Sequence, residues 1–161
     1  MSAQQSMRWM MFISLTLALF LTLVPLPPDW DDWRPQWVTL LLIFWCLTLP
    51  ERIGVFWGFG MGLMLDMFTS GLLGQQALSL SLVAYVTIKL HARVRLFPRW
   101  QQSFFVWILL LAERLLTLWI LGATGQPMPT LAYWLPTLVG LVLWPWLASV
   151  FSWLGQRTGA L

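Results

Sequence analysis

The sequence contains few charged residues: 9% of its 161 residues are Asp, Glu, Lys or Arg, whereas 59% are hydrophobic. Ordinary soluble domains carry about 25% charged and about 45–50% apolar residues, so this composition excludes a typical water-soluble domain. The scarcity of charge therefore indicates a membrane protein, in which every charged side chain away from the lipid headgroups needs a reason.

Cysteine and histidine each occur once, as Cys46 and His91. One cysteine cannot form a disulfide within the chain, and one histidine without Cys, His or acidic companions does not make a metal site. The sequence also lacks a Walker motif, a zinc motif and a Ser-His-Asp arrangement, and no segment between the apolar stretches is long enough for a soluble catalytic domain. We therefore expect no enzyme, no cofactor, no metal and no nucleic-acid partner.

Six apolar stretches follow one another along the chain, at approximately residues 9–26, 37–49, 53–73, 77–90, 103–121 and 131–154. A span needs about 20 residues, so the second and fourth stretches must borrow neighbouring residues, lie in thinned bilayer or be shielded by other helices. The first stretch lacks a small-x-small cleavage site, which favours an uncleaved span over a signal peptide. The sequence predicts an all-α, polytopic bundle of six transmembrane helices that forms one integral membrane domain over residues 1–161.

Basic residues gather in alternate segments between these stretches. One side would carry Arg8, Arg52, Lys89, Arg93, Arg95, Arg99 and Arg157. The other side would carry only Arg34. The positive-inside rule then places both termini in the cytoplasm. The cluster KLHARVRLFPR, residues 89–99, has two interpretations: it anchors a hairpin to membrane lipids, or it binds an anionic partner.

Proline marks two further features. The segment PLPPDWDDWRPQ, residues 25–36, combines proline, acids and tryptophan, which predicts a stiff, ordered loop at the headgroup level. Pro136 and Pro145 both fall inside the sixth stretch, where each would remove a helical hydrogen bond and bend the helix. Neighbouring protein must then satisfy the freed carbonyl groups, so this span should pack against other helices.

Glycine recurs every fourth residue in the third stretch, at Gly54, Gly58 and Gly62, and the series ends at Asp66. Residues four apart share one face of a helix, so the glycines form a groove that another backbone can approach closely. The groove either receives a helix of a partner protein or receives one of the chain's own helices. In the second case Ala77, Ser81 and Ala84 of the fourth stretch could supply the opposing face.

Asp66 lies in a stretch without any basic residue, and a carboxylate in hydrocarbon costs at least a few kcal/mol. At about 1.5 Å per residue, Asp66 and Arg114 lie at similar depths, roughly 20 Å and 17 Å from the expected cytoplasmic surface. We therefore predict an interhelical Asp66–Arg114 ion pair. Glu113 points away from Arg114 on its helix and needs a separate explanation, as a group facing a polar cavity or a partner subunit.

Four ordered motifs resemble one known family. They are Arg34-Pro35-x-Trp37, Gly58-Phe59-x-x-Gly62-Leu63-x-x-Asp66, Leu73-Gly74-x-x-Ala77-Leu78 and Leu143-Trp144-Pro145-Trp146. Together they resemble the rod shape-determining protein MreD family of Gram-negative bacteria, over the whole chain. The family's pattern extends to Arg34, Pro35, Gly58, Gly62, Asp66, Leu73, Gly74 and Ala77, whereas Glu113 and Arg114 do not match it.

The resemblance implies a non-enzymatic inner-membrane subunit of the rod complex, or elongasome. Such a subunit is taken to bind the bitopic protein MreC and to support lateral wall synthesis with MreB, RodA and a class B penicillin-binding transpeptidase. The resemblance also implies a six-span fold similar to the substrate-binding subunits of energy-coupling-factor transporters.

Two functions therefore stay open. The first is a scaffold that offers a lipid-level surface to single-span partners. The second is a solute-binding subunit that uses Asp66, Glu113, Arg114 and the segment 71–76 as a pocket.

Overall fold

The computed structural model describes residues 3–157, which form seven α-helices, one 3-10 helix and no strand. In chain order these are α1 (Ala3–Leu23), α2 (Pro28–Asp31), α3 (Trp37–Thr48), α4 (Val55–Thr69), α5 (Gln75–Val94), α6 (Arg99–Ala123), η1 (Leu131–Trp134) and α7 (Leu135–Arg157). The all-α class predicted from the sequence is confirmed.

Four helical segments in the described part of the chain are long and apolar enough to cross a membrane: α1, α5, α6 and the combined η1–α7 segment. The apolar helices α3 and α4 are shorter, with 12 and 15 residues. The helix in the fourth predicted stretch is longer than expected. Helix α4 ends early, at Thr69, because the next residue, Ser70, adopts a left-handed conformation with φ of 53°. This architecture fits a membrane protein, and the count of six spans stays a prediction.

The short helix α3 forms the centre of the bundle. Every residue from Val38 to Leu47 is buried, and α3 packs against α1, α5, α6 and α7. A helix that is apolar on all sides is stable only when other apolar groups surround it, which explains why α3 has no polar face. Its Trp45 is fully buried and donates a hydrogen bond from Nε1 to Ser14 Oγ on α1, at 2.9 Å. Shielding by other helices is therefore how the structure accommodates this short stretch.

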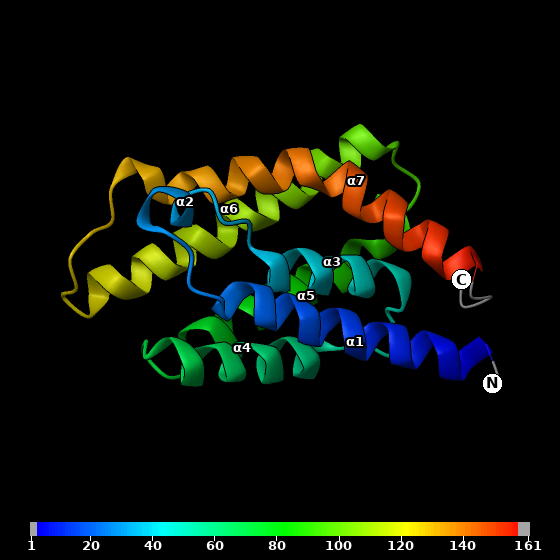
Figure 1. Cartoon of the computed structure of the whole chain (residues 1–161), viewed down its shortest axis with the longest axis horizontal. Helices are drawn as coiled ribbons and strands as arrows, with labels where there is room; N and C mark the ends of the chain where they lie inside the picture. Colours follow the sequence, from blue (N-terminus) through cyan, green and yellow to red (C-terminus); the bar gives the residue numbers. More distant parts are fainter. Residues whose placement is uncertain (1–2, 158–161) are drawn as a thin grey trace.

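The helices run back and forth between two ends of the molecule (Figure 1). The start of α1 and the end of α7 lie at one end, together with the α3–α4 and α5–α6 connections. The opposite end holds α2, the α4–α5 turn and the connection from α6 to η1. We call these the terminal end and the α2 end.

The α4 and α5 helices pack very closely, and glycine makes this possible. A Cβ atom at Gly58 would lie 2.7 Å from the carbonyl oxygen of Leu80, and one at Gly62 would overlap the backbone of Ala77. A Cβ atom at Gly54, by contrast, would meet nothing within 4 Å. The groove is thus formed by two of the three predicted glycines and is occupied by the chain's own α5.

The two prolines of the sixth stretch have different positions. Pro145 lies inside α7, next to Trp144, which is buried and packs near the Phe44 ring with a centroid distance of 6.4 Å. Pro136 is the second residue of α7, where the backbone N–H has no helical acceptor in any case. Pro136 therefore helps to start α7, and only Pro145 lies in the helix interior, where it removes one helical hydrogen bond although α7 continues through it. This corrects the expectation that both prolines disturb the helix.

Candidate functional site

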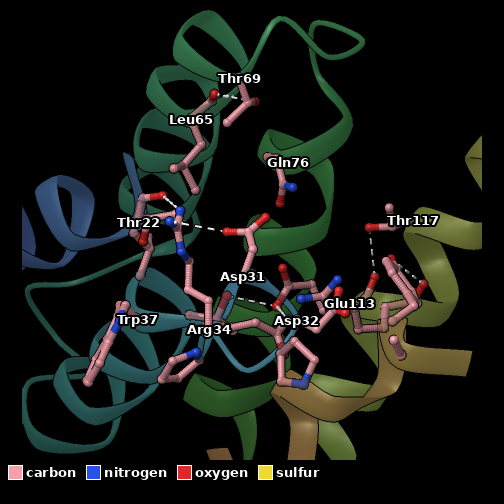
Figure 2. Close-up of a pocket in the computed structure, with 18 residues that line it drawn as sticks. Thr22, Asp31, Asp32, Arg34, Trp37, Leu65, Thr69, Gln76, Glu113 and Thr117 are labelled. Atoms are coloured by element: carbon pink, nitrogen blue, oxygen red, sulfur yellow. Dashed lines mark hydrogen bonds and ion pairs between the residues drawn. The ribbon is translucent and has the colours of Figure 1, made fainter. Parts of the chain in front are cut away.

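A polar cavity of about 420 Å³ opens at the α2 end of the bundle (Figure 2). It lies where the C-terminal parts of α1, α4 and α6 meet the starts of α3, α5 and α7. Charged and amide side chains from several of these elements line it, among them Arg34, Gln36, Gln76, Glu113 and Arg114. We refer to it as the α2-end cavity.

Glu113 on α6 is 7% exposed and binds α3 through one carboxylate oxygen. Its Oε2 accepts hydrogen bonds from Thr39 Oγ1 at 2.7 Å and from Gln36 Nε2 at 2.8 Å. These two donors satisfy the buried carboxyl oxygen, and they offset part of the cost of burying a polar group. The intramembrane acid predicted from the sequence therefore faces a polar cavity and links α6 to the central helix.

Arg114 follows Glu113 but contacts a different element. Its guanidinium carbon lies 4.3 Å from the centre of the Tyr133 ring, in a cation–π arrangement. The Tyr133 hydroxyl donates a hydrogen bond to the Arg114 backbone carbonyl at 3.3 Å. Arg114 thus holds η1 against α6 and presents its guanidinium group to the cavity wall.

Asp66 has a different set of partners from the predicted one. Its carboxylate accepts hydrogen bonds from the backbone N–H groups of Gly74 at 2.9 Å, Gln76 at 3.0 Å and Ala77 at 3.3 Å. Over residues 3–157 the structure forms one ion pair, between Arg34 and Asp31, and none between Asp66 and Arg114. The predicted Asp66–Arg114 ion pair is corrected: the N-terminus of α5 supplies the positive potential that a guanidinium group was expected to supply.

Gly74 completes this arrangement. It is the N-cap residue of α5 and has φ of 96°, in the left-handed region that favours glycine. A glycine has no side chain that could cap the helix, so Asp66, eight residues earlier on α4, accepts those hydrogen bonds instead. The family motif containing Gly58, Gly62 and Asp66 and the one containing Gly74 and Ala77 thus describe a single unit, the α4–α5 hairpin.

Arg34 ties the loop after α1 to the end of that helix. Its guanidinium group donates from Nη1 to the Thr22 carbonyl and from Nη2 to the Val24 carbonyl, and it pairs with Asp31 at 3.2 Å. Carbonyl groups at a helix C-terminus lack helical donors, and an arginine can bind two of them at once. Pro35 follows and accepts a hydrogen bond from the Trp37 N–H at 2.9 Å, next to the start of α3. Residues 25–36 contain the short helix α2 and several backbone hydrogen bonds, and the stiffness of this loop stays a prediction.

Three buried polar atoms of residues that line the α2-end cavity have no hydrogen-bond partner within the described protein. They are Arg34 Nε, Gln36 Oε1 and Arg114 Nε. Buried polar groups are almost always paired with protein, water or ligand. Two donors and one acceptor without a protein partner therefore belong to residues of the cavity wall.

The structure separates residues that the sequence had grouped together. Glu113, Arg114 and Gln76 line the α2-end cavity, whereas Asp66 is not part of its lining. Lys89, Arg93, Arg95 and Arg99 lie around the α5–α6 connection, at the terminal end.

Sequence reasoning missed Gln36, Thr39 and Tyr133 as partners of Glu113 and Arg114. The available signal was Gln36 and Thr39 themselves: two polar residues three apart, at the start of an otherwise apolar stretch. Such a pair lies on one face of a helix. Within residues 3–157, no group of three or more His, Cys, Asp or Glu side chains is placed to hold a metal ion.

Comparison with known proteins gives one family and one curated relative. The family described as "rod shape-determining protein MreD" matches residues 3–153. A protein of Haemophilus influenzae named "Rod shape-determining protein MreD" is 28% identical over 141 residues, which cover 87% of this chain and 87% of the relative. No solved structure gives a significant match.

Proposed function

The chain belongs to the MreD family of rod shape-determining proteins, and from this premise we propose that it is a non-enzymatic subunit of the rod complex, or elongasome. In this role it binds an MreC-like bitopic protein in the bacterial inner membrane and supports lateral peptidoglycan synthesis and rod cell shape. MreB, RodA and its class B penicillin-binding transpeptidase are the further proposed partners. The observation that carries this proposal is the family match over nearly the whole chain.

The proposed architecture has six spanning helices in one domain, with both termini in the cytoplasm. The distribution of charge supports this orientation. Arg8, Arg52 and the Lys89–Arg99 cluster belong to segments at the terminal end, whereas Asp29, Asp31 and Asp32 lie in or next to α2 at the other end. Because basic loops stay in the cytoplasm, the α2 end and its cavity face the periplasm. A fold similar to that of the energy-coupling-factor substrate-binding subunits remains part of this proposal.

We assign the partner surface to the outer face of α4, because its inner glycines are already occupied by α5. Gly60 lies on this outer face, is exposed, and would meet nothing within 4 Å if it carried a Cβ atom. Phe56, Met64 and Met67, which are 89%, 44% and 73% exposed, surround it along the helix. Small residues allow close helix contact in lipid, and methionine adapts to irregular partners, so this face suits a single-span helix.

Photocrosslinking in the membrane tests this assignment. A photoreactive residue at Phe56 or Met67 on α4 should capture the MreC-like protein, whereas one at Ile108 or Trp119, both exposed on α6, should not. Capture that is equal from α4 and α6 would contradict the surface. Failure of every position, together with normal rod shape in cells that lack the protein, would contradict the function itself.

Gly60→Leu and Gly62→Leu separate partner binding from folding. Gly60→Leu should leave the bundle folded but prevent co-purification with the MreC-like protein, because only the outer face changes. Gly62→Leu should unfold the α4–α5 hairpin, because the added side chain would overlap the backbone of Ala77. If the folded Gly60→Leu protein binds the partner normally, the partner helix docks elsewhere.

A second candidate function, solute binding, is favoured by the α2-end cavity. Its volume of about 420 Å³ lies within the range of about 300–1,000 Å³ that is usual for small-molecule sites. Native mass spectrometry of the purified protein would test it. A small polar molecule that is bound by the unmodified chain and lost in Arg114→Met would support this function, and a protein that carries only lipid and detergent would exclude it.

A further inference from the structure

A second cavity, of about 470 Å³, lies at the terminal end of the bundle. The end of α3, the connection from α5 to α6, the first turn of α6 and the C-terminal half of α7 surround it. We refer to it as the terminal-end cavity. It lies on the opposite end of the molecule from the α2-end cavity and shares no lining residue with it.

The charged side chains that line the terminal-end cavity are all basic. Arg95 and Arg99 line it together with neutral polar side chains, and no acidic residue in the described part of the chain does. Arg99 Nη2 donates one hydrogen bond, to Ser152 Oγ at 3.3 Å. Over residues 3–157 neither arginine forms an ion pair. Two guanidinium groups beside a cavity without a carboxylate create a positive potential that favours an anion.

A buried indole supplies a further donor. Trp144 lines the cavity, is 1% exposed, and its Nε1 has no hydrogen-bond partner within residues 3–157. An indole N–H can only donate, so it requires an acceptor. The N-terminus of α6 adds to the same effect: the Gln102 N–H donates to the Pro98 carbonyl, so the first N–H groups of α6, before Gln102, have no acceptor in their own helix. The Trp144 indole N–H and the first N–H groups of α6 are therefore donors that an anion at this cavity could use.

Exposed apolar side chains lie on or next to segments that line the cavity. Phe97 lines it and is 40% exposed, and the neighbouring Leu96 is 86% exposed. Trp153, next to the lining residue Ser152, is 50% exposed. An anion with apolar chains attached would place its charged group in the cavity and its chains along these side chains and along α7. This combination favours a lipid over a free ion.

We propose that the terminal-end cavity binds the phosphate group of an anionic phospholipid. Arg95 and Arg99 hold the phosphate oxygens, and the Trp144 indole donates to one of them. This assignment divides the basic cluster of residues 89–99 into two functions. Lys89 and Arg93 are exposed and do not line the cavity, so they contribute only general attraction to the membrane surface. The proposal does not depend on the partner role in the rod complex.

Native mass spectrometry of the delipidated full chain tests the proposal with three probes: dioleoylphosphatidylglycerol, dioleoylphosphatidylcholine and inorganic phosphate. The unmodified chain should bind phosphatidylglycerol more tightly than phosphatidylcholine, since the cavity offers no carboxylate for the choline group. Arg95→Gln with Arg99→Gln should weaken phosphatidylglycerol binding by about tenfold or more, because two charge-assisted hydrogen bonds are lost. Lys89→Gln with Arg93→Gln removes the same charge outside the cavity and should change binding by less than about threefold.

A third variant, Ser152→Leu, fills the cavity from α7 and leaves every charge in place. It should also weaken phosphatidylglycerol binding, and it provides an independent test if the double arginine variant does not fold. Equal losses in the two double variants would overturn the proposal, because surface charge alone would then explain binding. Inorganic phosphate that binds as tightly as phosphatidylglycerol would overturn the assignment to a lipid.

Discussion

Asp66, near the end of α4, accepts a hydrogen bond at 2.9 Å from the backbone N–H of Gly74, the residue that precedes α5. The same carboxylate also binds the N–H groups of Gln76 and Ala77. An α-helix leaves its first N–H groups without acceptors and carries a partial positive charge at that end. A single acid therefore satisfies three donors that have no acceptor within their own helix, and the helix in turn stabilises the acid.

Replacing Asp66 should destabilise the α4–α5 hairpin in proportion to the acceptors removed. Asp66→Asn keeps one carbonyl oxygen and should lower the unfolding free energy by about 1 kcal/mol. Asp66→Leu leaves three N–H groups without an acceptor and should lower it by about 3 kcal/mol or more. SDS titration of the protein in mixed micelles, followed by circular dichroism, measures both changes.

A double-mutant cycle distinguishes this capping role from an ion pair. Asp66→Asn and Arg114→Gln should be additive to within about 0.5 kcal/mol, as expected for residues without a shared contact. A coupling energy clearly above that value would mean that the two charges interact, contrary to the contacts of both side chains.

The sequence identified Asp66 as a residue that needs electrostatic compensation, but it could not identify the partner. Arg114 was the expected partner because it is a basic side chain at a similar depth along its helix, and charged side chains are the only charges that can be read from a sequence. Backbone N–H groups are the same for almost every residue type, so a sequence does not show which of them will bind an acid. Those at the start of α5 reach Asp66 only once the chain turns at Gly74. The close α4–α5 contact was predictable for the opposite reason, since Gly58 and Gly62 repeat at the helical period.

Helix length was also only partly predictable from the sequence. The short stretch 37–49 predicted a shielded helix, and α3 is buried on all sides. The stretch 53–73 predicted a full span, yet α4 ends at Thr69, because Ser70 adopts a left-handed conformation that apolar periodicity does not reveal. The partners of Glu113 could be identified only from the three-dimensional structure, since Gln36 and Thr39 lie 77 and 74 residues away in the chain.

Gly62→Ala and Gly60→Ala should have opposite outcomes, although both glycines lie in α4. A Cβ atom at Gly62 would overlap the backbone of Ala77, which can move only if the two helices separate, and overpacking of this kind costs about 1–3 kcal/mol. A Cβ atom at Gly60 would meet nothing within 4 Å, and alanine favours the helix, so stability should be unchanged or slightly higher. The same SDS titration compares the two variants, and an equal loss in both would contradict the close α4–α5 contact.

Glu113 and Thr39 should show a measurable coupling energy. In the cycle of Glu113→Leu with Thr39→Val, we expect a coupling of about 0.5–1.5 kcal/mol, because the Thr39 hydroxyl donates a hydrogen bond to Glu113 Oε2 at 2.7 Å. The matched control is Thr48→Val on the same helix, since the Thr48 hydroxyl donates to the Phe44 carbonyl within α3. Coupling between Glu113 and Thr48 should be close to zero. If both cycles give the same value, Glu113 acts on α3 as a whole and not through the Thr39 hydrogen bond.

Arg34→Lys should loosen the loop that follows α1 while leaving its charge unchanged. Lysine can still pair with Asp31, but it cannot bind the Thr22 and Val24 carbonyls together as the planar guanidinium does. Loss of one charge-assisted hydrogen bond is worth about 1.5 kcal/mol, so opening of the loop should become roughly tenfold more frequent. Hydrogen–deuterium exchange measures this directly, because the amides of Trp30, Trp33 and other loop residues are hydrogen-bonded within residues 25–36.

Arg52→Lys, in the connection between α3 and α4 at the terminal end, is the matched control and should leave these amides unchanged. The effect of Arg34→Lys should be local, so the amides of the turn between α4 and α5 should exchange at their original rate. Faster exchange in both places would mean that Arg34 stabilises the whole bundle. Unchanged exchange in both places would mean that the prolines alone hold the loop.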